Sequence, residues 1–295
     1  MAGVPAAADS PARIDFTGRD GNRLAADVAG PDDGPPVVLL HGGGQTRHSW
    51  GTTQAALAAR GWRAYSVDLR GHGESDWAPD GDYGLDAFAG DVLGVTTALD
   101  RPPALVGASL GGISSLAAVG EHPEATVGSA LVLVDVAPRI EEAGRDRIGQ
   151  FMGEHMDEGF GSLEEVADAI QRYNPHRPRP RDLSGLSKNL RQREGRWYWH
   201  WDPQFIRGMP GASDETRTSL VAPERLEAAA RNLRVPVLLV RGLVSDLLSE
   251  AGAQALLALI PQASMVSVEA GHMVAGDRND LFNDAVVRFL SGISS

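Results

Sequence analysis

Residues 105–112 read Leu105-Val106-Gly107-Ala108-Ser109-Leu110-Gly111-Gly112 and contain the pattern Gly-x-Ser-x-Gly. An apolar run, Ala104–Val106, precedes the pattern, and a helix-forming stretch, Gly111–Glu121, follows it. Small residues two positions before and after Ser109 allow a sharp strand-to-helix turn. Such a turn exposes the serine hydroxyl at the end of a strand, beside the positive end of a helix. The stretch therefore predicts that Ser109 is a catalytic nucleophile.

The rest of the chain alternates short apolar runs with longer amphipathic stretches. This order is typical of an α/β fold, in which helices flank a mostly parallel central sheet. The predicted strands are a hairpin, Arg13–Phe16 and Leu24–Val28, and then Val37–Leu40, Arg63–Asp68, Ala104–Val106, Ala130–Val136, Val237–Arg241 and Ser264–Val268. The predicted helices are Trp50–Arg60, Leu85–Asp100, Gly111–Glu121, Glu250–Ile260 and Asn279–Leu290.

Residues 139–220 interrupt this alternation with proline-rich, aromatic and polar stretches and no candidate for a buried parallel strand. We expect them to form a mainly helical lid, or cap, inserted between two halves of one core, residues 13–138 and 221–295. Residues 1–12, rich in Ala and Pro, are expected to form a flexible tail.

A glycine-rich segment, His41-Gly42-Gly43-Gly44, directly follows the predicted strand Val37–Leu40. Glycines let a backbone approach a substrate closely, so the amide of Gly43 is expected to form an oxyanion hole with the amide of Leu110. Gly44 is expected to contact the substrate. His41 is expected to brace this loop rather than to transfer protons.

A serine hydroxyl needs a nearby base, and His272 follows the last predicted strand and precedes the C-terminal helix. The base in turn needs a carboxylate that fixes its tautomer. Asp246 follows the strand Val237–Arg241 and completes the chain order nucleophile, acid, base, so we take it as the acid. Asp135 ends the preceding predicted strand and is the alternative. Activity is expected to fall in acid, because a protonated imidazole cannot act as a base.

The composition excludes several other classes of protein. With 27 Lys and Arg against 39 Asp and Glu, the formal charge is −12, which disfavours nucleic-acid binding. The chain has no cysteine, and its histidines and carboxylates show no metal-ligand spacing, so no metal or other cofactor is expected. No run of about 18 apolar residues or signal peptide is found, so we expect a cytoplasmic protein that does not bind membranes.

Together, these residues resemble the α/β-hydrolase superfamily. The resemblance includes Asp68–Asp76 (Asp-Leu-Arg-Gly-His-Gly-Glu-Ser-Asp), similar to a structural loop after the family's fourth strand. The run Gly271–Asp277 is similar to the branch labelled epoxide-hydrolase-like or non-haem haloperoxidase-like. The resemblance implies that the lid is inserted after the sixth strand, which fits residues 139–220.

The epoxide hydrolases and haloalkane dehalogenases of this fold use an aspartate nucleophile, whereas this chain has Ser109. Serine attack on an epoxide would leave an ether that water cannot readily hydrolyse, so Ser109 implies acyl chemistry. We expect a hydrolase of a carboxylic ester or lactone of a small, apolar or aromatic molecule. The alternatives are a cofactor-free perhydrolase resembling haloperoxidases, a hydrolase of carbon–carbon bonds, and a non-catalytic small-molecule receptor that keeps the triad.

An aromatic cluster lies within the predicted lid, where five aromatic residues fall between positions 197 and 205. Trp197, Trp199 and Trp201 are interpreted either as a substrate wall over Ser109 or as packing between lid and core. Trp199 and Trp201 would project to one side if the segment is extended. Met273, next to His272, is a candidate pocket residue. The expected partner is a small-molecule substrate, and a homo-oligomer remains open.

Overall fold

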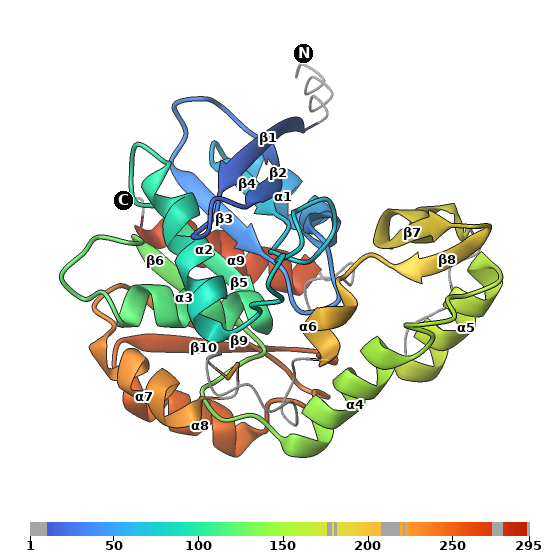
Figure 1. Ribbon diagram of the computed structural model, residues 1–295. Coiled ribbons are helices and arrows are strands. Elements are labelled where there is room, and N and C mark those ends of the chain that lie inside the picture. The colour runs from blue at the N-terminus through green and yellow to red at the C-terminus, as the bar shows by residue number, and fades with distance from the viewer. Residues whose placement is uncertain are drawn as a thin grey trace, which may run out of the picture.

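A twisted sheet runs through the computed structural model (Figure 1), which describes residues 11–175, 179, 182–207, 219–220, 222–272 and 280–293. Within those residues eight strands form the sheet, in the order β1-β2-β4-β3-β5-β6-β9-β10. From β4 across to β10 all neighbours are parallel, whereas β2 is antiparallel to β1 and to β4. The strands are β1 (Ala12–Thr17), β2 (Arg23–Ala29), β3 (Pro36–Leu40), β4 (Arg63–Val67), β5 (Ala104–Ala108), β6 (Ala130–Val134), β9 (Val237–Gly242) and β10 (Ala263–Val268).

Helices cover both faces of this sheet, as Figure 1 shows. The helices of the core are η1 (Arg47–Trp50), α1 (Gly51–Ala58), α2 (Leu85–Thr97), α3 (Leu110–Gly120), α7 (Pro223–Asn232), α8 (Glu250–Leu259) and α9 (Asp280–Ile293). The predicted α/β-hydrolase fold class is confirmed, and the predicted strands and helices are found, with boundaries that differ by a few residues. Helix α7 has no counterpart among the predicted helices.

The strand β3 shows why the central strands are apolar throughout. Val37 and Leu39 face a core layer that includes Trp50 and residues of α1 and α9, whereas Val38 and Leu40 face the layer covered by α2, α3, α7 and α8. Because successive side chains point to opposite faces, a strand covered on both sides needs an apolar residue at every position. All five residues of β3 are buried accordingly.

We call residues 139–220, between β6 and β9, the inserted segment. Its described elements are α4 (Glu142–Gly153), α5 (Leu163–Tyr173), η2 (Ser184–Asn189), β7 (Leu190–Arg193), β8 (Arg196–Trp199) and α6 (Pro203–Arg207). Of these, α4, α5, β7 and β8 stand apart from the sheet and form the projecting part of the molecule on the right of Figure 1. The hairpin β7–β8 adds strands to a segment predicted to be mainly helical. That this segment is a separate lid remains a prediction.

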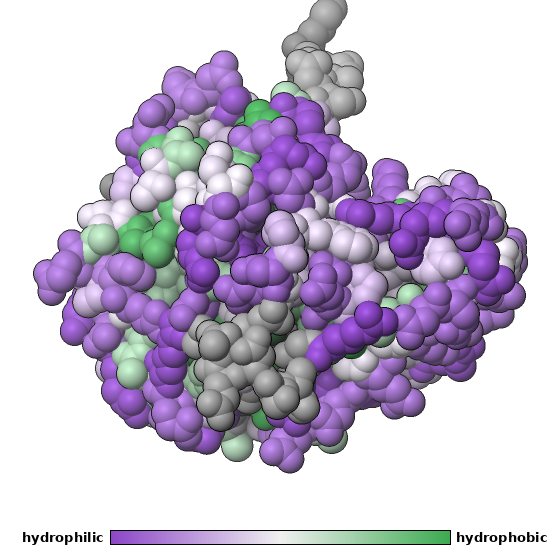
Figure 2. Space-filling view, viewed as in Figure 1, coloured by the Kyte–Doolittle hydropathy of each residue, from purple (hydrophilic) through white to green (hydrophobic). Residues whose placement is uncertain are grey.

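The surface seen in Figure 2 is mostly hydrophilic, with small hydrophobic patches. No helix within the described ranges has the length and apolar character needed to cross a membrane. Of the expected tail, residues 1–10 lie outside the described part of the chain.

Candidate active site

Ser109 lies at the turn between β5 and α3 in a backbone conformation that non-glycine residues rarely adopt. Its φ is 45° and its ψ is −111°. Hydrogen bonds on both sides hold this turn, because the Ser109 amide donates to the carbonyl of Val134 (3.1 Å) and the Ser109 carbonyl accepts from the amide of Ile113 (3.0 Å). Strain of this kind persists only where the surrounding structure enforces it, and it is concentrated at functional sites.

The glycines of the Gly-x-Ser-x-Gly pattern are required by close backbone contacts. A Cβ atom on Gly107 would lie 2.5 Å from the backbone of Gly111, and one on Gly111 would lie 2.4 Å from the carbonyl oxygen of Leu40. Both distances are shorter than any real Cβ contact, so only glycine allows the strand and the helix to approach this closely. The pattern thus lies between a strand and a helix, which is the context from which Ser109 was predicted to be a nucleophile.

The oxyanion loop, His41–Gln45, follows β3 and lies opposite this turn. The amide of Gly42 donates to Oε1 of Gln45 (2.9 Å), and the amide of Gly44 donates to Nε2 of His72 (3.1 Å). The amide of Gly43, between them, has no acceptor among the described residues. It is therefore available to a ligand.

The amide of Leu110 is the second predicted oxyanion donor. Leu110 is the first residue of α3, and the first amides of a helix have no acceptor within the helix. The partial positive charge at this helix end also favours a developing anion. Leu110 and Gly43 line the same cavity as Ser109, so the structure brings together the residues predicted for the oxyanion hole.

His41 is fully buried beneath the oxyanion loop. Its Nδ1–H donates to the carbonyl of Gly42 (2.8 Å), and its Nε2 accepts from the amide of Leu69 (3.0 Å). Burial lowers its pKa, which keeps the ring neutral, and a neutral ring can both donate and accept. These bonds place His41 where the sequence predicted it, as a brace of the loop.

Two further histidines hold Gly44 from both sides. His72 Nδ1–H donates to the carbonyl of Arg70 (2.9 Å), so its Nε2 is free to accept from the Gly44 amide. His200, from the inserted segment, donates through Nε2 to the Gly44 carbonyl (3.4 Å) and accepts at Nδ1 from the amide of Gly73 (2.7 Å). The oxyanion loop is thus fixed partly by a side chain of the inserted segment, a connection that the sequence analysis missed.

Both of these imidazoles are buried, and both are held neutral by that burial. The pKa of His72 falls to about 3 and that of His200 falls well below its ordinary value, in each case because burial penalises the charged ring. The ring centroids of His41 and His72 are 5.2 Å apart, and those of His72 and His200 are 5.8 Å apart. Like charges at these distances would repel, so a proton on one ring would further disfavour a proton on the next.

The base predicted from the sequence, His272, is oriented by a carboxylate. Its Nδ1 lies 2.8 Å from Oδ2 of Asp135, which follows β6 and is completely buried. The carboxylate also accepts from the amide of Gly242 (2.9 Å) and from the hydroxyl of Ser245 (2.5 Å). Three donors therefore hold the carboxylate of Asp135 in position, and it accepts from Nδ1–H of His272 and so fixes the orientation of the imidazole.

The prediction that Asp246 partners His272 is wrong. Asp246 is 40% exposed and forms an ion pair with Arg147 of α4. The reason is the turn after β9. There the Ser245 hydroxyl accepts hydrogen bonds from the amides of Leu247 (3.1 Å) and Leu248 (3.3 Å), and it donates one to Asp135. This turn directs Asp246 toward the inserted segment and leaves Asp135, the alternative, beside the imidazole.

A cavity of about 150 Å³ joins the predicted residues. Ser109 and His272 both line it, together with both oxyanion residues. The remaining lining is mostly apolar and consists of Gly42, Gly44, Gln45, Ala108, Ile113, Ile140, Arg145, Ile148, Phe151, Met152, Tyr173, Phe205, Leu220 and Leu247. A mostly apolar hollow with a few polar groups at one point is the usual form of a small-molecule site.

The aromatic wall of this cavity is not the one predicted. Within the described residues the cavity is lined by Phe151, Tyr173 and Phe205, and by none of the three tryptophans. The sequence could have indicated the residues of α4 that line the cavity, because Ile148, Phe151 and Met152 have the spacing i, i+3, i+4 of one apolar helix face.

The predicted tryptophans lie farther out. Trp199 and Trp201 stack with ring centroids 4.8 Å apart and planes 13° apart, as expected for an extended segment. They line a second cavity of about 420 Å³ that shares Gly44, Gln45, Phe151 and Tyr173 with the first. Trp197 pairs through its backbone with Phe160 and packs against the core, which agrees with the packing interpretation. Met273 lies outside the described residues.

Comparisons with known proteins agree with this fold and site. Residues 37–285 match the alpha/beta hydrolase family. The chain is 35% identical over 175 residues to Esterase Rv0045c of Mycobacterium tuberculosis (strain ATCC 25618 / H37Rv), a match that covers 57% of this chain and 57% of the esterase, less than two thirds of either. It is 27% identical over 261 residues to the 3-hydroxybutyrate-oligomer hydrolase of Cupriavidus necator, covering 85% and 87% of the two chains.

The crystal structure of E-2-(acetamidomethylene)succinate hydrolase matches with a TM-score of 0.79 at 23% identity, covering 95% of this chain and all of that one. At this identity the match shows a shared fold. The family match spans more than half of the sequence and includes Ser109, Asp135 and His272. The chain therefore belongs to the alpha/beta hydrolase family and is a hydrolase.

Proposed function

We propose that the protein hydrolyses a carboxylic ester or lactone of a small apolar or aromatic molecule through an acyl-enzyme on Ser109. The observation that carries the proposal is one cavity that holds the Ser109 turn, two available amides and His272, with His272 bonded to buried Asp135. Relatives named as an esterase and as an oligomer hydrolase support it.

In the proposed reaction, His272 accepts the Ser109 proton at Nε2 as the serine oxygen attacks the substrate carbonyl. Asp135 stabilises the imidazolium that forms. The amides of Gly43 and Leu110 donate to the developing oxyanion. His272 then returns the proton to the leaving alcohol, and a water molecule, activated by the same imidazole, releases the acid from the serine.

The shape of the cavity supports a small apolar substrate. Phe151, Tyr173 and Phe205 line it with several aliphatic side chains, and its volume of about 150 Å³ limits the size of the bound group. Such a lining stabilises an acyl or alcohol part by removing its apolar surface from water. The inserted segment supplies all three aromatic residues, so it supports the substrate preference.

A panel of p-nitrophenyl esters with short, long and aromatic acyl groups tests the proposal, with Ser109→Ala as the matched variant. We expect hydrolysis by the native protein, loss of nearly all turnover in the variant, and one organophosphate bound per native chain, at Ser109. An inert panel together with no labelling would contradict the proposal. Turnover that requires added hydrogen peroxide would instead identify a perhydrolase.

A further inference from the structure

A separate cavity of about 170 Å³ lies between the hairpin β7–β8 and the loop that carries Trp77. Its volume is far above the roughly 10–15 Å³ that one water molecule needs. It shares no lining residue with the cavity of Ser109. Its lining residues are Trp77, Met156, Arg191, Arg193, Tyr198, Trp199, Trp201 and Pro203, and no carboxylate is among them.

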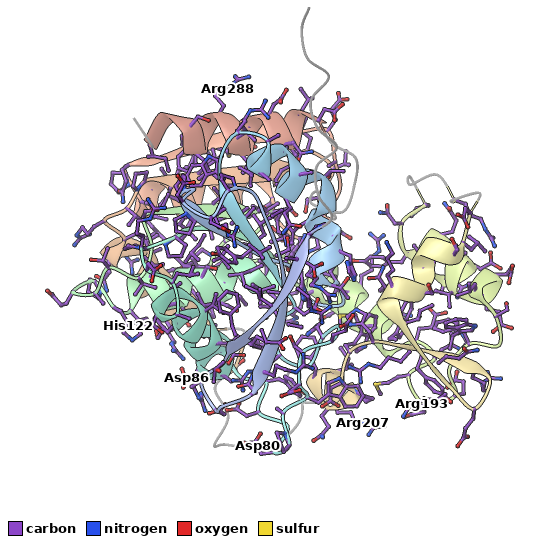
Figure 3. The ribbon with its side chains drawn as sticks, turned by 90° about the horizontal axis from the view of Figure 1, so that it is seen from above. Asp80, Asp86, His122, Arg193, Arg207 and Arg288 are labelled. Carbon is purple, nitrogen blue, oxygen red and sulfur yellow. The ribbon has the colours of Figure 1, made fainter. Side chains whose placement is uncertain are left out.

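Two arginines line this cavity without a carboxylate partner. Arg191 and Arg193 are two residues apart on β7, so their side chains lie on the same face of the hairpin. Within the described part of the chain neither forms an ion pair. Instead, the Arg191 guanidinium lies 4.6 Å from the ring centroid of Trp77 and that of Arg193 lies 4.3 Å from the ring of Tyr198. Figure 3 labels Arg193 on the inserted segment.

This arrangement is unusual in a chain of formal charge −12. Arg191 is half-buried, and both its burial and the nearby charge of Arg193 lower its pKa. The charges of Asp202 and Asp68 oppose this lowering, but neither carboxylate forms an ion pair with Arg191 within the described residues. Two neighbouring cations repel each other, and an anion between them would reduce that repulsion.

Two indole N–H groups provide an independent observation. Nε1 of Trp77 and Nε1 of Trp201 are buried and have no acceptor within the described residues. Trp201 is only 2% exposed, and both residues line the cavity. A buried donor without an acceptor is energetically costly, so such groups call for a partner. The lining of the cavity thus includes two arginines without an ion pair and two tryptophans whose indole N–H groups lack an acceptor within the described residues.

We propose that this cavity is a binding site for the carboxylate or phosphate group of a small molecule, held by Arg191 and Arg193 and by the indole N–H groups. A guanidinium presents paired donors whose geometry matches the oxygens of either group. The rings of Trp77 and Tyr198 already hold the two guanidiniums in place, so little side-chain freedom is lost on binding.

The site is connected with the oxyanion loop. Arg191 donates to the carbonyl of Gly73 (2.8 Å), and the amide of Gly73 donates to His200. His200 in turn donates to the carbonyl of Gly44. Trp201 also reaches this loop, because its Cζ3 lies 3.4 Å from the position of a Cβ on Gly44. These contacts give a route by which an anion bound at this site would affect the position of the oxyanion loop and hence turnover.

The test is a titration of the native protein with inorganic phosphate and, separately, with succinate, against sodium chloride at matched ionic strength. Proton–nitrogen correlation spectra resolve the six tryptophan indole N–H groups, and Trp77→Phe and Trp201→Phe assign two of them. We expect a saturable shift of the Trp77 and Trp201 signals with one or both anions. Equal shifts with chloride, or shifts confined to other tryptophans, would refute the site.

Variants of the arginines complete the test. Arg191→Met and Arg193→Met should each weaken binding at least about tenfold, because each removes a charged donor. Arg191→Lys keeps the charge but loses the paired donors and should be intermediate. Arg60→Met is the control and should bind as the native protein does, because Arg60 is an exposed arginine after α1 that does not line the cavity. Equal affinity in all four variants would overturn the proposal. Because the readout is binding, failure here leaves the esterase proposal untouched.

Discussion

Nδ1 of His272 lies 2.8 Å from Oδ2 of Asp135, and this bond joins the end of β6 to the loop after β10. In the sheet β6 lies between β5, which leads to Ser109, and β9. The acid is therefore one strand nearer to the nucleophile than the chain order nucleophile, acid, base suggested. The Asp135 backbone has a φ of 51°, so this turn, like that of Ser109, has a conformation rare for a non-glycine residue.

The first prediction concerns this carboxylate. Asp135→Asn should lower kcat by about 10³–10⁴-fold, because an amide cannot stabilise the imidazolium and allows the wrong tautomer of His272. Steady-state kinetics on the best ester of the panel measure the effect. Chemical unfolding of the variant shows whether a folded protein is assayed, since Asp135 also accepts bonds from Gly242 and Ser245.

Asp246→Asn is the matched control. It removes the same charge from the partly exposed pair with Arg147, and surface ion pairs contribute little, about 0–1 kcal/mol. Its kcat should remain within about threefold of the native value. A loss of kcat in Asp246→Asn as large as that expected for Asp135→Asn would contradict the assignment of Asp135 as the acid.

The sequence was sufficient for the nucleophile turn but not for the acid. Gly107, Ser109 and Gly111 could be interpreted locally, because the strand, the turn and the helix are consecutive in the chain. Asp135 and Asp246 both follow strands that end at the same edge of the sheet, and the choice between them depends on the turn that Ser245 closes. That turn is stabilised by contacts between β6 and β9, which are separated by about a hundred residues that include the inserted segment.

The cavity wall was hard to predict for a similar reason. Trp199 and Trp201 stand out in the composition of the inserted segment, but they lie in the outer cavity. Phe151, Tyr173 and Phe205 come from three different helices, and only the packing of α4, α5 and α6 on the core brings them together. The periodicity of apolar residues predicts which side of each helix is apolar. Tertiary contacts decide which of these sides lines the cavity.

A second prediction uses the strain at Ser109. Ser109→Ala and Ser109→Gly should both be inactive, but the glycine variant should be the more stable by about 1 kcal/mol, because glycine accepts a positive φ without the Cβ penalty. Denaturant unfolding of the two variants measures the difference. Equal or lower stability of the glycine variant would show that the turn stores no strain.

A third prediction concerns His200 as a positioning residue. His200→Phe fills a similar volume but removes the donor to the Gly44 carbonyl and the acceptor for Gly73. A displaced Gly43 amide should lower kcat about tenfold or more, with KM within about twofold, because an oxyanion donor acts in the transition state. His200→Gln, which can still donate and accept, should recover part of kcat. A change confined to KM would indicate a role in substrate binding instead.

The last prediction follows from the buried neutral imidazoles. Unfolding returns His41, His72 and His200 to water, where a histidine has a pKa of about 6.5. Folding depresses all three pKa values, that of His72 to about 3. Below about pH 6.5 the unfolded chain therefore binds more protons than the folded protein, and stability must fall as the pH is lowered toward the folded pKa values.

Urea unfolding at several pH values between 7 and 4 measures this dependence. Each buried histidine should contribute a slope approaching about 1.4 kcal/mol per pH unit once the unfolded ring is fully protonated. His72→Gln, whose amide oxygen can accept from Gly44, should lose one such contribution and show a shallower slope even if its stability at pH 7 is lower. An identical slope in the native protein and the variant would mean that His72 binds its proton equally in both states, against the burial and the bond from Gly44 that keep it neutral.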